Sequence, residues 1–229
     1  MRTKLIRFAA NQVAKNVIEH GDTRWSTIKG NWLTSFFGND NPIVLECGCG
    51  YGEYSVGLAK KSPNKNFIGI DIKGSRIFVG SKQASEQNLN NVAFLRTQLL
   101  FLPDFFDKDE VDEIWVTFPD PRPKDKDERR RLISPRFLKL YNKVLKEGGI
   151  VHLKTDNTFL YEYSIELLQS LGIELLENES DLYQNQELLA QHHGLQTRYE
   201  KLFMGKGEMI KYLKFRLKSE DLASIDKWN

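Results

Sequence analysis

Residues 46–52 read Glu-Cys-Gly-Cys-Gly-Tyr-Gly, and this stretch decides the fold. It follows a short apolar run at 43–47 and precedes a helical pattern at 53–61. Glycines between a strand and a helix allow the backbone to turn sharply and to approach a ligand closely. The stretch therefore predicts the first strand–turn–helix unit of an α/β fold, with a ligand at the turn.

The residues beyond this turn alternate between strand and helix patterns. We expect strands at 66–71, 92–96, 113–117, 150–154, 173–176 and 212–217, and helices at 75–88, 135–146 and 158–171. This alternation predicts a Rossmann-like α/β fold, in which a mostly parallel seven-stranded sheet carries helices on both faces. Residues 1–40 do not fit the alternation and are expected to form an N-terminal extension. Residues 41–229 are expected to form one domain, with a loop-rich insertion at 178–208.

Composition narrows the class of partners. With a net charge of only +2, the chain needs a local basic patch to bind a nucleic acid. Cys47 and Cys49 are too close for an ordinary disulfide, and no other Cys or His pair completes a zinc site, so we expect no metal. No apolar run is long enough for a signal peptide or a membrane span, which predicts a cytoplasmic protein without membrane contact.

Two acidic residues indicate what the glycine turn binds. Asp71 ends the next predicted strand, where a carboxylate can accept hydrogen bonds from both hydroxyls of a ribose. Glu46 precedes the glycines, and a carboxylate there would repel a pyrophosphate but suits the cationic amino-acid end of S-adenosylmethionine. Gln98, after the third predicted strand, either pairs with the adenine edge or is an ordinary surface glutamine.

A proline-rich loop follows the predicted strand at 113–117. Residues 118–124 read Phe-Pro-Asp-Pro-Arg-Pro-Lys, so Asp120 lies in a stiff loop near the expected ligand site, unless it is simply a solvated residue. The run Arg129–Arg131 beyond it is either a solvated face or a contact for a phosphate backbone. The loop and the run together favour an acidic site beside a basic RNA-binding surface.

Five segments together resemble the bacterial tRNA (guanine-N7)-methyltransferases, which are class I S-adenosylmethionine-dependent methyltransferases. They are the turn at 46–52, FPDPRPK at 118–124, RRRL at 129–132, HLKTDN at 152–157 and TRYE at 197–200. The similarity spans roughly residues 40 to 217. It implies transfer of a methyl group from S-adenosylmethionine to N7 of a guanine in tRNA, at position 46 of the variable loop. It also implies a methyltransferase domain at 41–229 whose segment 178–208 binds substrate, in a monomer or homodimer.

The resemblance assigns roles to individual residues. Asp120 would be the catalytic residue, because a rigid carboxylate stabilises the positive charge that develops when N7 is methylated, and no general base is needed. Tyr199 would stack on the base or else belong to the core. By the same resemblance the cofactor would contact Glu46, Gly48, Gly50, Asp71, Gln98 and Asp120, and the substrate would contact Lys124, Asp156, Thr197, Arg198, Tyr199 and Glu200. From its position alone, Asp156 also fits an N-cap for the following helix.

Three departures from the family pattern stand out. Arg122 occupies a position that is usually Trp, and Gln98 one that is usually Asp. Acidic residues interrupt the basic stretch at 125, 127 and 128, so we expect either a weaker affinity for RNA or a part of that affinity from the N-terminal arm with Arg2, Lys4 and Arg7. Two other functions stay open: a class I methyltransferase acting on another RNA, a protein or a small molecule, and an RNA-binding module with a degenerate cofactor site.

Overall fold

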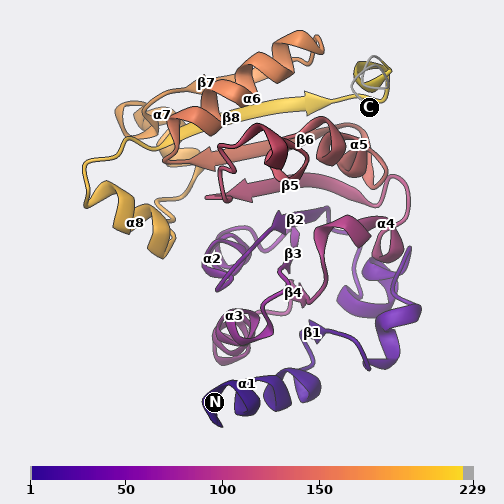
Figure 1. Cartoon of the computed structure of the whole chain (residues 1–229). Coiled ribbons are helices and arrows are strands. Elements are labelled where there is room, and N and C mark those ends of the chain that lie inside the picture. Colours follow the sequence, from indigo (N-terminus) through magenta and orange to yellow (C-terminus); the bar gives the residue numbers. More distant parts are fainter. Residues whose placement is uncertain (1, 224–229) are drawn as a thin grey trace.

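Eight strands form a single sheet in the order β1-β4-β3-β2-β5-β6-β8-β7 in the computed structural model, which describes residues 2–223 (Figure 1). Strands β1 to β6 pair in parallel, and β8 runs antiparallel to both β6 and β7. The mostly parallel sheet is as predicted, but it has eight strands where seven were expected. The strands are β1 (Val17–Ile18), β2 (Ile43–Cys47), β3 (Asn66–Ile70), β4 (Val92–Leu95), β5 (Val111–Thr117), β6 (Leu145–Thr155), β7 (Leu175–Glu179) and β8 (Lys211–Leu217).

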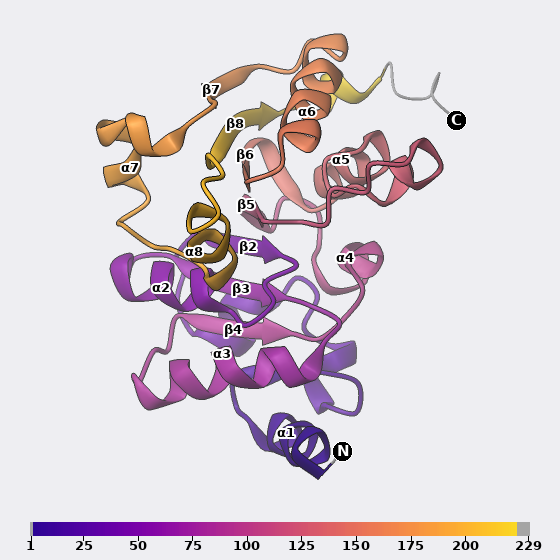
Figure 2. The same ribbon diagram turned by 60° about the vertical axis from the view of Figure 1, so that its left-hand side comes forward.

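Helices cover both faces of this sheet (Figure 2). The α-helices are α1 (Arg2–Val13), α2 (Glu53–Lys61), α3 (Gly74–Glu86), α4 (Leu102–Phe105), α5 (Pro135–Asn142), α6 (Thr158–Ser170), α7 (Gln186–Gln191) and α8 (Arg198–Met204). Residues of β2 alternate between two hydrophobic clusters, because successive side chains of a strand point to opposite faces. Buried residues of α2 and α3 belong to one cluster, and those of α5 and α6 belong to the other.

Several predicted boundaries are wrong, most clearly at β6 and β7. The helix expected at 135–146 ends at Asn142, and β6 already begins at Leu145, so Gly148 and Gly149 lie inside the strand rather than before it. Leu145 pairs with Val111 before the register shifts, and Gly148 has φ 70°, as expected where a strand bulges. Strand β7 begins two residues later than predicted, where Leu175 pairs with Phe215 of β8. Pairing in the sheet has overridden the local pattern in both places.

The first 40 residues contribute the eighth strand. Val17 and Ile18 pair with Phe94 and Leu95 of β4, and α1 packs against α3. Trp32 is fully buried, and its indole Nε1 donates to the carbonyl of Phe105 at 2.8 Å. The predicted N-terminal extension is therefore packed onto the sheet along much of its length.

The strand order reverses between β2 and β5. The chain adds β3 and β4 on one side of β2 and then crosses to β5 on the other side, so the carboxyl ends of β2 and β5 meet at a topological switch point. Ligands of open α/β sheets bind in the crevice at such a point. The glycine turn and the Pro-Asp-Pro loop both leave the sheet there.

No described helix has the length and apolarity that crossing a bilayer would require.

Replacing Trp32 with Ala should lower the free energy of unfolding by about 3–5 kcal/mol, because the change empties a large buried site and leaves the Phe105 carbonyl without its donor. Urea unfolding followed by circular dichroism measures the difference. Leu5→Ala, on the exposed side of α1, is the matched control and should change stability by less than about 0.5 kcal/mol. Equal effects of the two changes would show that residues 1–40 add little to the folded core.

Candidate functional site

The glycine turn between β2 and α2 forms the floor of the site. Gly48, Gly50 and Gly52 all have positive φ, at 82°, 56° and 71°, which other residues rarely adopt. The amides of Gly48 and Cys49 donate to the carbonyl of Ile70 at 2.8 and 2.9 Å, which ties the turn to the end of β3. A Cβ on Gly50 would meet no described atom within 4 Å, so the backbone there faces open space. The turn can thus be approached closely by a ligand.

Glu46 lies beneath this turn with its carboxylate buried. One oxygen, Oε2, accepts from the amide of Ser55 at 2.9 Å and from its hydroxyl at 2.5 Å, and Oε1 accepts from the Thr117 hydroxyl at 2.7 Å. Burial raises the pKa of Glu46 to about 7, although these hydrogen bonds oppose the shift. The residue lines the cavity, so a cationic group bound there would favour the ionised form.

Asp71 supports the turn from the side. Its Oδ2 accepts from the amide of Gly50 at 3.0 Å, and its Oδ1 accepts from the amide of Lys73 at 2.7 Å. Asp71 and the exposed Gln98 are not among the described residues that line the cavity. Asp71 thus orients the turn, and cofactor contact by either residue stays a prediction.

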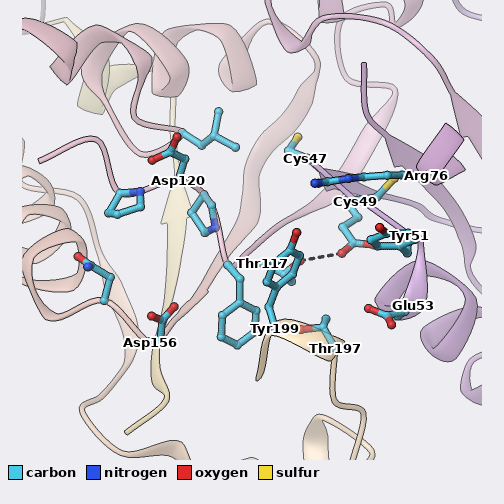
Figure 3. A pocket seen from close by; sticks show the side chains of 18 of the residues that line it. Cys47, Cys49, Tyr51, Glu53, Arg76, Thr117, Asp120, Asp156, Thr197 and Tyr199 are labelled. Carbon is cyan, nitrogen blue, oxygen red and sulfur yellow. Dashed lines mark hydrogen bonds between the residues drawn. The ribbon is translucent and has the colours of Figure 1, made fainter. Parts of the chain in front are cut away.

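The Pro-Asp-Pro loop forms the opposite wall. Phe118 and Arg122, which bracket it, both have φ 47°, an uncommon value for residues other than glycine. Asp120 is exposed and lines the cavity across from Tyr51 and Arg76 (Figure 3). One of its carboxylate oxygens lies 3.0 Å from the Arg122 Nε in an exposed ion pair, and the other accepts from the Arg122 amide at 3.4 Å. Arg122 therefore contacts the carboxylate through both its side chain and its backbone.

The third wall comes from the end of β6 and the start of α8. Asp156 follows β6 and lines the cavity half-buried, and burial raises its pKa. The helix after it is capped by Asn157, whose side chain accepts from the amide of Leu160, so the N-cap role that Asp156 fits by position belongs to its neighbour. Thr197 and Tyr199 at the start of α8 also line the cavity (Figure 3). Tyr199 is partly exposed there, rather than buried in the core.

Glu200 does not reach the cavity. Its side chain is fully buried, and its Oε1 lies 2.7 Å from the Nζ of Lys154 in β6 and accepts from the Tyr183 hydroxyl at 2.9 Å. Its backbone amide donates to Thr197 in a capping box at the start of α8. Burial lowers the pKa of Lys154, and the carboxylate of Glu200 opposes that shift. Glu200 thus forms a buried ion pair that docks α8 on the sheet, and its contact with substrate stays a prediction.

Arg198 and Lys124 are likewise not among the residues that line the cavity. The Arg198 guanidinium lies 3.9 Å from the centre of the Tyr51 ring, and its Nε lies 3.3 Å from a carboxylate oxygen of Glu53. Lys124 is exposed and precedes the short helix Asp125–Arg130. Arg198 packs over the rim of the turn, whereas Lys124 is free to meet a large substrate outside the cavity.

The cavity has a volume of about 650 Å³. Of the predicted site residues, it brings together Glu46, Gly48, Gly50, Asp120, Asp156, Thr197 and Tyr199. Residues that the sequence did not single out complete the lining, among them Tyr51, Glu53, Arg76, Phe118, Leu132 and Phe203. Tyr51 stands inside the glycine motif and could have been flagged, whereas Arg76 and Phe203 carry no local signal. The cavity thus has a buried carboxylate on Glu46, an exposed one on Asp120 and a half-buried one on Asp156, together with aromatic rings. This lining suits a flat ligand beside a cationic one.

Cys47 and Cys49 are both free and buried at the turn, and burial raises the pKa of Cys47 to about 12. Among residues 2–223, no group of three or more Cys, His, Asp or Glu side chains is arranged to hold a metal ion.

Comparison with known proteins shows the family to which the chain belongs. A family model described as "Putative methyltransferase" matches residues 40–213. A tRNA (guanine-N(7)-)-methyltransferase of Christiangramia forsetii is 46% identical over 221 residues, covering 95% of this chain and 99% of the relative. One from Porphyromonas gingivalis is 49% identical, covering 85% of this chain and 79% of the relative.

Solved structures support the fold. An antibiotic-related methyltransferase superposes with a TM-score of 0.61 at 20% identity, covering 89% of this chain and 96% of its own. The 16S rRNA methyltransferase KamB superposes with a TM-score of 0.60 at 15% identity, covering 88% and 95%. At these identities the likeness concerns the fold alone, and it confirms the predicted Rossmann-like class.

Glu46 should make the wild-type protein less stable as the pH rises from about 5 to about 8. Between the ordinary carboxyl pKa of 4.5 and about 7, the folded protein keeps a proton that the unfolded chain has lost. The difference costs the folded state about 3 kcal/mol by pH 8. Urea unfolding of the wild type and of Glu46→Gln at pH 5 and pH 8 measures it, since the glutamine amide of the variant does not titrate. Parallel pH profiles for the two proteins would contradict the assignment.

Lys154→Met should lower the free energy of unfolding by about 3–5 kcal/mol, because it leaves the Glu200 carboxylate buried without its partner. The double change Lys154→Met/Glu200→Leu should recover more than half of that loss, because it removes the stranded charge as well. Chemical unfolding of both variants gives the comparison. Equal destabilisation of the single and double variants would mean that the ion pair is not what holds α8 to β6.

Proposed function

Since the chain belongs to the family of tRNA (guanine-N(7)-)-methyltransferases, we propose that it transfers a methyl group from S-adenosylmethionine to N7 of a guanine in tRNA. The observation that carries the proposal is the cavity itself, which joins the glycine turn after β2 to the Pro-Asp-Pro loop after β5. We further propose that the guanine is at position 46, in the variable loop.

The residues at the glycine turn fit the proposed cofactor. S-adenosylmethionine supplies an activated methyl group on a sulfonium, together with an ammonium and an adenosine. The buried carboxylate of Glu46 would hold the ammonium, and the backbone at Gly48 and Gly50 leaves space for the chain that follows it. Asp71 would bind the ribose, and Gln98 would meet the adenine edge from its exposed position.

Asp120 would act on the reacting base. Guanine N7 carries a lone pair and needs no deprotonation, so the protein has to align the base and stabilise the positive charge that develops on its ring. An exposed carboxylate at the cavity rim, held by Arg122, suits this task. The aromatic side chains of Phe118, Tyr199 and Phe203 offer surfaces on which the purine can stack.

Other groups would hold the nucleotide and the rest of the tRNA. Asp156 would accept hydrogen bonds from N1 and N2 of the guanine, and Thr197 would add a hydroxyl. Outside the cavity, Lys124, Arg198 and the exposed Arg129 would meet phosphates, which makes binding salt-sensitive. Segment 178–208, which includes α7 and α8, would be the substrate-binding part of the 41–229 domain.

The N-terminal helix is a second candidate for phosphate contact. In α1, the Arg7 guanidinium donates a hydrogen bond to the Ser75 carbonyl at 3.3 Å, and the Lys4 amine lies over the ring of Phe8. Arg2 belongs to the same predicted arm, but its side chain lies outside the described part of the structure. We further propose that the protein acts in the cytoplasm and that it is either a monomer or a homodimer.

The wild-type protein should place 7-methylguanosine in tRNA when it is incubated with S-adenosylmethionine, and nucleoside mapping should find it at position 46. Asp120→Asn should lower kcat about 100-fold, because it removes the charge that stabilises the methylated ring. Its affinity for S-adenosylhomocysteine, measured by calorimetry, should stay within about threefold of wild type.

Asp125→Asn is the matched control, an exposed acid five residues along that lies outside the cavity, and it should keep the wild-type kcat. Near-normal turnover by Asp120→Asn would remove Asp120 from the mechanism. Methylation of a different RNA, a protein or a small molecule, with tRNA left unmodified, would assign the chain to another class I methyltransferase activity.

A further inference from the structure

The three consecutive arginines at 129–131 do not lie on one surface. Arg129 and Arg130 end the short helix Asp125–Arg130 and are exposed, whereas Arg131 is only 3% exposed. The backbone of Arg131 is extended, with φ −65° and ψ 133°, and this change of direction turns its side chain into the protein. Phosphate contact, expected of the whole run, is thus open to the first two arginines and closed to the third.

Arg131 is held by aromatic rings and by the Pro-Asp-Pro loop. Its guanidinium carbon lies 4.8 Å from the ring centre of Phe159 and 4.2 Å from that of Tyr163, both in α6. Its Nε donates to the backbone carbonyl of Arg122 at 3.0 Å. Because a planar guanidinium that packs against two rings in a buried position has little freedom, this donor is held in one orientation. Arg131 thus connects α6 to the end of the loop that carries Asp120.

That loop needs support at both ends. Phe118 and Arg122 each have φ 47°, and residues other than glycine keep such values only where their surroundings hold them. The amide of Phe118 donates to the carbonyl of Lys154 in β6 at 2.7 Å, which anchors the first end. The hydrogen bond from Arg131 anchors the second end, at the residue whose own side chain pairs with Asp120.

We propose that Arg131 is a positioning residue for methyl transfer, which fixes the Arg122 end of the loop and so places the Asp120 carboxylate over the cavity. The proposal rests on the proposed function. It gives Arg131 a different role from Arg129 and Arg130, which face solvent and are open to contact with the nucleic acid.

Arg131→Lys and Arg131→Gln test this role in the full-length protein. The lysine keeps the charge and most of the packing between Phe159 and Tyr163, but it lacks the Nε–H that reaches Arg122. Both variants should lower kcat about 10- to 100-fold, because the carboxylate is no longer held in register with the base. The KM for tRNA and the Kd for S-adenosylhomocysteine should stay within about threefold of wild type, and the slope of log KM against log salt should not change.

Arg129→Gln is the matched control two residues away. It should keep the wild-type kcat, raise the KM for tRNA several-fold and reduce the salt slope by about one unit, as expected for one lost phosphate contact. If Arg131→Lys behaves in the same way, with normal kcat and a reduced salt slope, Arg131 contacts RNA and the positioning role is overturned.

Hydrogen–deuterium exchange gives a readout that does not depend on the substrate. The amides of Phe118 and Arg122 should exchange at least about fivefold faster in Arg131→Lys than in wild type, and at the wild-type rate in Arg129→Gln. Unchanged exchange in Arg131→Lys would overturn the proposal even if tRNA is the substrate. A wild-type protein that leaves tRNA unmodified would refute the proposed function, while faster loop exchange would still show that Arg131 holds the loop.

Discussion

The buried carboxylate of Glu46 is the interaction on which the site depends. It extends from the end of β2 and accepts hydrogen bonds from Ser55 in α2 and from Thr117 at the end of β5. A single side chain therefore joins the two halves of the sheet at the point where the strand order reverses. Because both oxygens are already bonded and burial raises the pKa to about 7, the same group that fixes the architecture is also poised to respond to a cation in the cavity.

The opposite wall of the cavity is assembled by a different means. Asp120 is exposed, and its position follows from a loop whose two end residues have positive φ and are each tied to a neighbouring element. The Lys154–Glu200 ion pair holds α8 beside this loop. It thereby fixes the helix that carries Tyr199 and Phe203, two aromatic residues of the cavity lining. The Glu46 carboxylate is buried and held by hydrogen bonds, whereas the Asp120 carboxylate is exposed and positioned by the backbone of its loop. The two can therefore interact with different positive charges.

Much of this arrangement could be predicted from local sequence. The bounds of β2 and α2 agree with their patterns to the residue, because a glycine turn separates two well-defined periodicities. Strand β1 could not be found in this way, since two residues carry no periodicity and their pairing with β4 lies 77 positions along the chain. The burial of Glu200 and Arg131 was missed for the same reason. In the sequence they stand in a substrate motif and a basic run, and only the fold shows that Lys154 and the α6 rings enclose them.

The pairing of β1 with β4 also has a consequence for the order in which the protein folds. Val17 and Ile18 leave the ribosome before their partners Phe94 and Leu95, which are made 77 residues later. The edge of the sheet can close only after β2, β3 and β4 exist, and α1 has no surface to dock on until α3 has formed. During synthesis α1 and β1 thus take their final places only after the later elements on which they pack have been made. Apolar residues that the folded sheet buries, such as Val17 and Ile18, stay accessible to chaperones through that interval.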